Sequence, residues 1–310
     1  MNSISDEQSR EHNIRCLAAM RRLYSDAKVL ATVQIVLSVP IVALWTVLAT
    51  LFVGLRVYAA CWGLFVFAVD VLVFAPWEER MRSKAAAIQE LFDCTVLHMD
   101  WPALKAGSPP EPEAICAGAS RYLARVGDEG LRDWYPPSVR DLPLHLARIV
   151  CQRANCWWDA ELRRRYADWT GVTLVVLIFL LVLVGLAGHL DLNSFMLSVI
   201  MPLLPAIVMG ARQHHTQMQA ATRLDNLREH ADVLWNDAIN GIKNPDECAR
   251  ESRSLQDEIF DSRRRNPSIP DCIYRRLKRQ QEEQMNRSAE DLVREALDNR
   301  HKWADAGEQT

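Results

Sequence analysis

The stretch GVTLVVLIFLLVLVGLAG, residues 171–188, carries no charge and decides the fold of this chain. Together with Trp169 and Thr170 it makes an apolar window of 20 residues. A helix of that length is roughly 30 Å long, which matches the hydrocarbon core of a membrane. The stretch therefore predicts a transmembrane helix at 169–188.

Three further windows have the same character, and the four together form two pairs. The first window, 29–55, is separated from the second, 57–76, by Arg56 alone; residues 189–191 separate the third from the fourth, 192–211. One such window could be a buried helix of a large soluble protein, but four in two tight pairs favour a membrane. We expect an all-α membrane protein whose four transmembrane helices form two hairpins.

Nearly all charged residues lie outside these windows, and the basic ones predict how the chain is oriented. The chain has 310 residues with a formal net charge of -3, and 24% of the residues are charged. Arginine and lysine gather at one end of each pair of windows, whereas the other ends carry only Arg56. The basic ends carry Arg15, Arg21, Arg22, Lys28, Arg80, Arg82, Lys84, Arg163, Arg164, Arg165, Arg212 and Arg223. By the positive-inside rule these ends face the cytoplasm, together with both termini.

The sequence thus predicts a multi-pass protein with five parts. They are a cytoplasmic N-terminal helix (1–27), hairpin 1 (28–76), a cytoplasmic helical segment (77–168), hairpin 2 (169–211) and a cytoplasmic helical tail (212–310). The middle segment and the tail together are expected to form one helical cytoplasmic region. Seven of the eight cysteines lie on the reducing side of the membrane, so no disulfide framework is expected.

The cytoplasmic parts read as helices joined by short turns. A loop at 106–113 contains three prolines, and a helical pattern runs from Pro143 toward the third window. In the tail, Asn240 and Gly241 mark a helix end, and SAED at 288–291 reads as a capping box that opens a last helix. The tail is therefore expected to be helical and to pack on the middle segment.

The stretch CQRANCWWD, residues 151–159, is dense enough in cysteine and tryptophan to suggest a metal site or a catalytic loop. On a helix, however, Cys151 and Cys156 point roughly 140° apart, so they cannot share a metal ion. The sequence also contains no HExxH, no Gly-rich phosphate loop and no nucleophile elbow. It therefore predicts no enzyme, no metal site and no cofactor.

Polar residues in and around this stretch share one side of the helix. On a helix, five of them fall within about 80° of one another: Arg148, Gln152, Asn155, Asp159 and Arg163. One interpretation of this polar stripe is a solvated face with one Asp159–Arg163 ion pair. The other is a ligand site in which arginines bind phosphates, amides meet base edges, and Trp157 or Trp158 stacks on bases.

One charge lies inside an apolar window. Asp70 is about six residues from the cytoplasmic end of its helix, roughly 9 Å deep, where a charged side chain should face protein or water. Gln34 lies at similar depth on the first helix and could instead donate a hydrogen bond to Asp70. The fourth window adds further candidates for a pore lining: Ser194, Ser198, Pro202 and Pro205. We expect the second and fourth helices to line a pore and the third to face lipid.

Several of these stretches also resemble a known family. LHLARIVCQRANCWWDAELRRRYADW (144–169), LFDCTVLHMDW (91–101), WYPP (134–137) and LQDEIFDSRRRNPSIPDCIYRRL (255–277) are similar to the SMODS-associating four-transmembrane (S-4TM) pore-forming effectors. The resemblance covers nearly the whole chain, and its motifs name no catalytic residue.

The resemblance implies a role in bacterial antiphage defence. A partner nucleotidyltransferase would make a cyclic oligonucleotide on infection, and the effector would sense it through its cytoplasmic helical region. The effector would then oligomerise or open and permeabilise the bacterial inner membrane in abortive infection. The implied partners are the cyclic oligonucleotide, the lipid bilayer and further copies of the chain, with no nucleic acid polymer.

Two other functions stay open from the residues alone. A small constitutive channel or transporter would need polar residues at the membrane midplane, and Asp70 is one candidate. A membrane scaffold that recruits a partner through its helical tail needs no intramembrane charge, so Asp70 argues mildly against it. Four helices are too few for an obvious pore in a monomer, and a homo-oligomer is therefore expected.

Overall fold

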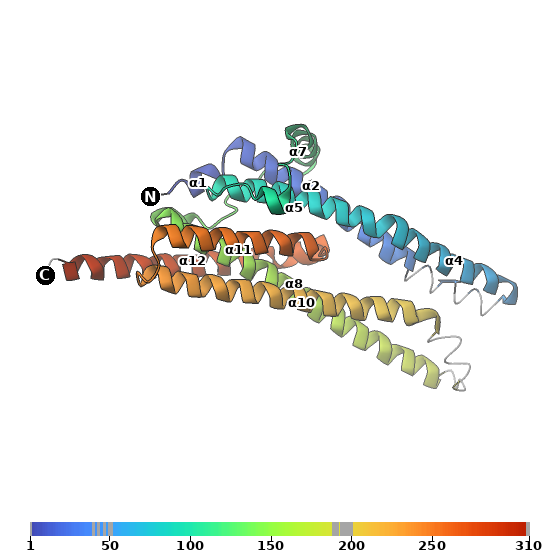
Figure 1. Ribbon diagram of the computed structural model, residues 1–310. Helices are drawn as coiled ribbons and strands as arrows, with labels where there is room; N and C mark the ends of the chain where they lie inside the picture. Colours follow the sequence, from blue (N-terminus) through green and yellow to red (C-terminus); the bar gives the residue numbers. More distant parts are fainter. Residues whose placement is uncertain are drawn as a thin grey trace.

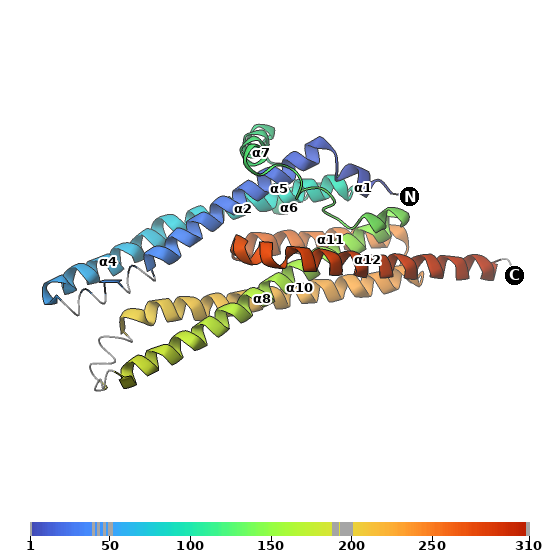
Figure 2. The ribbon, with the colours of Figure 1, turned by 180° about the vertical axis from the view of Figure 1, so that it is seen from behind.

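The computed structural model describes residues 2–38, 52–187 and 201–307, together with Ile41, Leu44, Trp45, Leu48 and Leu192. The regular structure of these residues is helical, without a strand. The helices form an elongated body that divides into two hairpins at one end (Figures 1 and 2). The all-α prediction is thus confirmed.

Hairpin 1 is made of long helices that continue into the body. Helix α2 (Glu11–Ser38) packs along α5 (Ala75–Val96). A 3₁₀ turn at Val53–Leu55 precedes α4 (Arg56–Val69), and a π-helical segment, Asp70–Phe74, joins α4 to α5 without a break. The predicted boundaries at 27/28 and 76/77 therefore fall inside continuous helices.

Hairpin 2 has the same design. Helix α8 (Leu144–Ala187) has 44 residues and begins directly after Pro143, as the sequence predicts, and α10 (Met201–Ile239) has 39 residues. The two helices pack closely at Gly210, where an added Cβ would lie 2.7 Å from the Leu174 side chain. Small residues allow this close approach between membrane helices.

Two helices among the described residues are long and apolar enough to cross a membrane, Cys61–Val96 and Leu144–Leu183. They overlap most of the second and third predicted spans, 57–76 and 169–188. The first and fourth predicted spans include residues outside the described part of the chain. Large apolar side chains along the helices are exposed, for example Leu72 and Val175. Such continuous apolar faces match contact with lipid or with further copies.

The middle segment folds back over hairpin 1. It contains α6 (Ala103–Ala106), α7 (Pro112–Val126) and a 3₁₀ turn at Pro137–Asp141. Helix α7 packs on α2, where a Cβ added at Gly118 would lie 3.1 Å from Ala19 Cβ. A short N-terminal helix, α1 (Ile4–Glu7), packs against that 3₁₀ turn.

The tail supplies two helices that pack on the body, as the sequence predicts. Helix α11 (Pro245–Arg265) packs on α5, α8 and α10, and α12 (Asp271–Gly307) packs on α8. Asn244 caps α11 by accepting hydrogen bonds from the backbone N–H groups of Asp246 and Glu247.

One predicted helix boundary in the tail is wrong. Ser288 does not open a new helix, because α12 runs through it without a break. No glycine or proline occurs between Pro270 and Gly307, so the helical hydrogen bonds continue past the capping residues. Ser288 instead meets Arg153 of α8, whose Nη1 lies 3.2 Å from the Ser288 hydroxyl oxygen.

Candidate functional site

The polar stripe of α8 faces the interior of the helical body. Gln152 is fully buried, and Arg163 is only 7% exposed. Gln152 Nε2 donates a hydrogen bond to the Ser252 carbonyl at 2.8 Å, and the Ser252 hydroxyl donates to Gln152 Oε1 at 2.8 Å. These hydrogen bonds join α8 to α11. The interpretation of the stripe as a solvated face is therefore wrong.

The other members of the stripe also bind protein groups. Arg148 donates to the backbone carbonyls of Leu97, at 2.6 Å, and His98, at the end of α5. Asn155 Nδ2 donates to the Tyr135 hydroxyl at 3.1 Å. A ligand at these positions would have to replace internal hydrogen bonds.

The ion pair expected within the stripe is present. Arg163 Nε lies 3.1 Å from Asp159 Oδ2. The same guanidinium donates to Gln217 Oε1 at 2.8 Å and to the Pro267 carbonyl at 2.9 Å. Arg163 thus connects α8 with α10 and with the tail.

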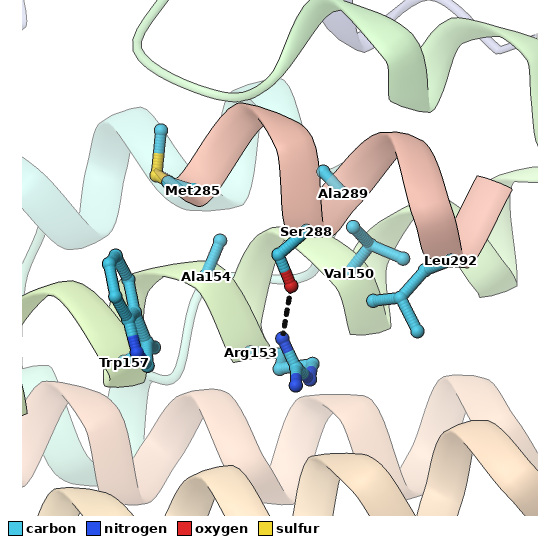
Figure 3. Close-up of a pocket in the computed structure, with 8 residues that line it drawn as sticks. All are labelled: Val150, Arg153, Ala154, Trp157, Met285, Ser288, Ala289 and Leu292. Atoms are coloured by element: carbon cyan, nitrogen blue, oxygen red, sulfur yellow. Dashed lines mark hydrogen bonds between the residues drawn. The ribbon is translucent and has the colours of Figure 1, made fainter. Parts of the chain in front are cut away.

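Both tryptophans of the stretch CQRANCWWD, Trp157 and Trp158, are half-buried. Trp157 lines a groove between α8 and α12, beside the hydrogen bond of Arg153 with Ser288 (Figure 3). The cavity in this groove has a volume of about 10 Å³. Small-molecule sites occupy roughly 300–1,000 Å³. The groove in this conformation is therefore too small for a cyclic oligonucleotide.

A buried polar network joins α5 to α11 at the centre of the body. Glu90 and Asp93 of α5 are both fully buried. Arg253 Nη2 lies 2.6 Å from Glu90 Oε1, and Arg263 Nη1 lies 2.5 Å from Asp93 Oδ2. Gln256 Nε2 is 2.9 Å from an oxygen of each carboxyl group. Buried charges with this many partners are strongly interdependent, because removing one leaves another without compensation.

The charge states of the network follow from burial and from these contacts. Burial and the neighbouring Asp93 raise the pKa of Glu90, while the two arginines oppose this shift. Burial lowers the pKa of Arg263, but Asp93 leads the acidic neighbours that raise it above its ordinary value, so the guanidinium stays charged. Burial also raises the pKa of Tyr135, whose hydroxyl lies 2.7 Å from Asp93 Oδ1. Tyr135 therefore remains a donor to that carboxylate.

The start of α12 lies between the two hairpins. We call residues 266–277 the tail junction. On the side of hairpin 1, Lys28 Nζ of α2 lies 2.5 Å from Asp271 Oδ1. On the side of hairpin 2, the Arg276 guanidinium lies over the Trp169 ring of α8, 5.0 Å from its centroid. The tail junction therefore contacts both hairpins where they leave the body.

A small apolar cluster supports the same junction. It contains Leu162, Ile269, Ile273 and Leu277, with Tyr166 and Tyr274 packed against it. Two of these residues belong to α8 and four to the tail. Burial of apolar side chains here holds the tail against hairpin 2.

Asp70 and Gln34 are brought together inside hairpin 1. Gln34 Nε2 donates to Asp70 Oδ1 at 2.5 Å, which is the hydrogen bond that the sequence suggested. Asp70 also begins the π-helical segment, and Pro76 follows it without a backbone N–H. Segments of this kind often occur at functional sites.

The remaining pore candidates belong to hairpin 2. Ser194 and Ser198 lie outside the described residues. Pro202 and Pro205 lie within α10. A pore lining by the second and fourth helices stays a prediction.

The cysteines of α8 lie in the core and not in a metal cluster of the described residues. No group of three His, Cys, Asp or Glu side chains in this part of the chain is placed to hold a metal ion. Cys151 and Cys156 are fully buried in α8. Burial raises the pKa of Cys156 to about 12, so its thiol stays protonated at neutral pH.

Sequence reasoning missed the buried polar network. A signal was present, because Glu90 and Asp93 flank Leu91 and Phe92 on a helix that otherwise packs into the core. Their arginine partners are more than 160 residues away in the chain. Helical spacing cannot identify partners at that distance.

Comparisons with known proteins agree with the resemblance found in the sequence. The family model described as the SMODS-associating 4TM effector domain matches residues 2–292. A probable CBASS effector molecule from Bacillus cereus (strain VD146) is 23% identical over 292 residues, which cover 90% of this chain and 95% of that protein. No solved structure matches the chain. Because the family match extends over nearly the whole sequence, the chain belongs to the SMODS-associating 4TM effector family.

Proposed function

We propose that this protein is a membrane effector of antiphage defence that senses a cyclic oligonucleotide with its helical body. On binding, it oligomerises or opens and permeabilises the bacterial inner membrane. The family membership and the name of the Bacillus cereus relative support the defence role. The observation that carries the mechanism is the continuity of the helices between the body and the apolar hairpins.

Helix α8 illustrates this continuity. Its first half packs into the body, with Ile149 and Cys156 fully buried, whereas Val175 and Phe179 in its second half are exposed. Helix α5 continues in the same way through the π-helical segment into α4. A rotation or shift of either helix in the body is therefore transmitted to its apolar end.

Pore formation in this proposal requires several copies of the chain. The two hairpins diverge from the body (Figures 1 and 2), and their apolar side chains remain largely exposed. Further copies can cover part of these faces while lipid covers the rest. The body would control this assembly through the tail junction, which contacts both hairpins.

The test is ligand-induced leakage from liposomes. Purified protein in vesicles that contain a self-quenching dye is expected to release the dye after addition of one cyclic di- or trinucleotide from a panel of adenine and guanine compounds. The corresponding linear dinucleotides serve as the control and should cause no release. Release without any nucleotide would favour a constitutive channel, and no release with the whole panel would favour a scaffold.

The proposed orientation gives a separate prediction by thiol labelling. Cys116 of α7 is exposed, but on the cytoplasmic side it should not react with an impermeant maleimide in intact spheroplasts. A Gly54→Cys variant places a thiol at the outer turn of hairpin 1, where an added Cβ meets nothing within 4 Å. We expect labelling of Gly54→Cys in intact spheroplasts and labelling of Cys116 only in inverted vesicles. Labelling of Cys116 in intact spheroplasts would contradict the orientation.

A further inference from the structure

Arg21 lies between two aromatic rings from distant parts of the chain. It belongs to α2 of hairpin 1, whereas Trp134 precedes the 3₁₀ turn at Pro137–Asp141 and Tyr274 lies in the tail junction. The carbon of the Arg21 guanidinium is 5.3 Å from the Trp134 ring centroid and 4.6 Å from the Tyr274 ring centroid. Arg21 Nη2 also donates to the Tyr274 hydroxyl. Three segments therefore converge on one guanidinium.

Two hydrogen-bond donors in this cluster have no partner among the described residues. They are Arg21 Nε and Trp134 Nε1, and both atoms are buried. Buried donors in proteins are nearly always satisfied, because an unmade hydrogen bond retains the full penalty of desolvation. Both groups can only donate. Each of the two therefore needs an acceptor.

The charge of the cluster favours an anionic acceptor. The other two arginines of α2 each have a carboxylate, since Arg15 pairs with Glu11 and Arg22 pairs with Asp26. The contacts recorded for Arg21 within the described part of the chain include no carboxylate. A half-buried guanidinium without a counter-charge is unfavourable unless an anion binds it.

The cluster also reaches the surface. Lys28 lies at the edge of the cluster, where its Nζ is 5.7 Å from the Tyr274 ring centroid. The Lys28 side chain is 20% exposed. Its partner Asp271 is 44% exposed. An anion that takes the place of Asp271 on Lys28 can therefore approach Arg21 from this side.

We propose that Arg21, Lys28, Trp134 and Tyr274 form a binding site for a phosphodiester anion. Arginine offers a planar set of donors that matches phosphate oxygens, the indole N–H adds a further donor, and the aromatic rings can contact nucleobases. The cyclic oligonucleotide of the proposed function supplies such an anion, and in that respect the inference rests on the proposed function. A phospholipid headgroup carries the same group and is the alternative source.

The location explains how binding acts on the hairpins. Arg21 is on the helix that continues into hairpin 1, and Tyr274 packs against the apolar cluster that includes Leu162 of α8. A phosphodiester that bridges Arg21 and the tail junction changes how the tail holds the two hairpins together. The site is thus placed at the connection that the proposed mechanism requires.

The test compares Arg21→Met with Arg15→Met on the same helix. Wild-type protein in phosphatidylcholine nanodiscs is titrated with cyclic di-AMP, cyclic di-GMP, cyclic GMP–AMP and cyclic tri-AMP by calorimetry. We expect one of them to bind, and Arg21→Met to weaken that binding by about tenfold or more, while Arg15→Met leaves it unchanged. Trp134→Phe keeps a ring but removes the N–H, and should weaken binding by about fivefold. If thermal unfolding shows that Arg21→Met does not fold, the Trp134→Phe variant is used to test the site instead.

A second arm identifies the source of the anion. Wild type and the same variants are placed in nanodiscs of phosphatidylcholine with phosphatidylglycerol, and retained lipid is measured by native mass spectrometry. Selective loss of phosphatidylglycerol in Arg21→Met would assign the site to lipid. Unchanged nucleotide and lipid binding in both Arg21→Met and Trp134→Phe would overturn the site while leaving the proposed function intact. If no nucleotide binds wild type, the sensing step of the proposed function fails, whereas the lipid arm still decides the anion site.

Discussion

Arg263→Met is expected to lower the free energy of unfolding by about 3–5 kcal/mol, because it leaves a buried charge without compensation. The Arg263 side chain is 10% exposed and contacts Asp93 at 2.5 Å and Glu90 at 4.0 Å. Both carboxyl groups are fully buried, and after the substitution Arg253 still contacts Glu90, whereas Asp93 keeps no arginine partner among the described residues. Methionine restores the apolar volume but not the charge.

The matched control is Arg265→Met, two residues further along the same helix. The Arg265 side chain is 76% exposed and lies 3.6 Å from Asp261, so its loss should change the free energy of unfolding by less than about 1 kcal/mol. Denaturant unfolding in detergent, followed by tryptophan fluorescence, measures both variants. Adding Asp93→Asn to Arg263→Met should recover part of the stability, since it removes the uncompensated charge. Equal effects of Arg263→Met and Arg265→Met would show that the network contributes little.

Asp70→Asn is expected to make the proposed pore non-selective, because Asp70 in its lining would give it a preference for cations. In an assembly of several copies, one carboxylate per copy at the same depth makes a ring of negative charge, which attracts cations and repels anions. Asparagine keeps an oxygen that accepts the hydrogen bond from Gln34, so the packing of hairpin 1 should be preserved. The substitution thus separates the charge of Asp70 from its role in helix packing.

The reversal potential across a planar bilayer under a KCl gradient measures this preference once the pore is activated. In wild type the reversal potential should be shifted toward the equilibrium potential of K⁺. In Asp70→Asn it should be close to zero. Gln34→Leu removes the hydrogen bond but keeps the charge, and should retain the cation preference. An unchanged potential in Asp70→Asn, at unchanged expression, would restrict Asp70 to its hydrogen bond with Gln34.

Features that depend on local sequence were predicted well. Apolar windows long enough to cross a membrane identified the helices of both hairpins. Pro143 marked the start of α8. Asn240 and Gly241 marked the end of α10, because these residues favour the backbone conformation that ends a helix. The capping signal at Ser288 misled, since a cap ends or begins a helix only where the neighbouring residues also break the pattern.

Helical periodicity also identified which polar residues of α8 share a side, but it could not say what that side faces. Tertiary packing placed Gln152 against Ser252 of α11 and so turned the side into an interior surface. The residue pairs that define the sites are far apart in the chain. Asp93 and Arg263 are separated by 170 residues, and Arg21 and Tyr274 by 253 residues. The sequence by itself therefore determined the helices and their membrane character, because hydrophobicity and backbone preference act over a few neighbouring residues. Only the tertiary structure decided which charges are buried together and which donors lack a partner, because desolvation and ion pairing depend on neighbours that the chain brings together only when it folds.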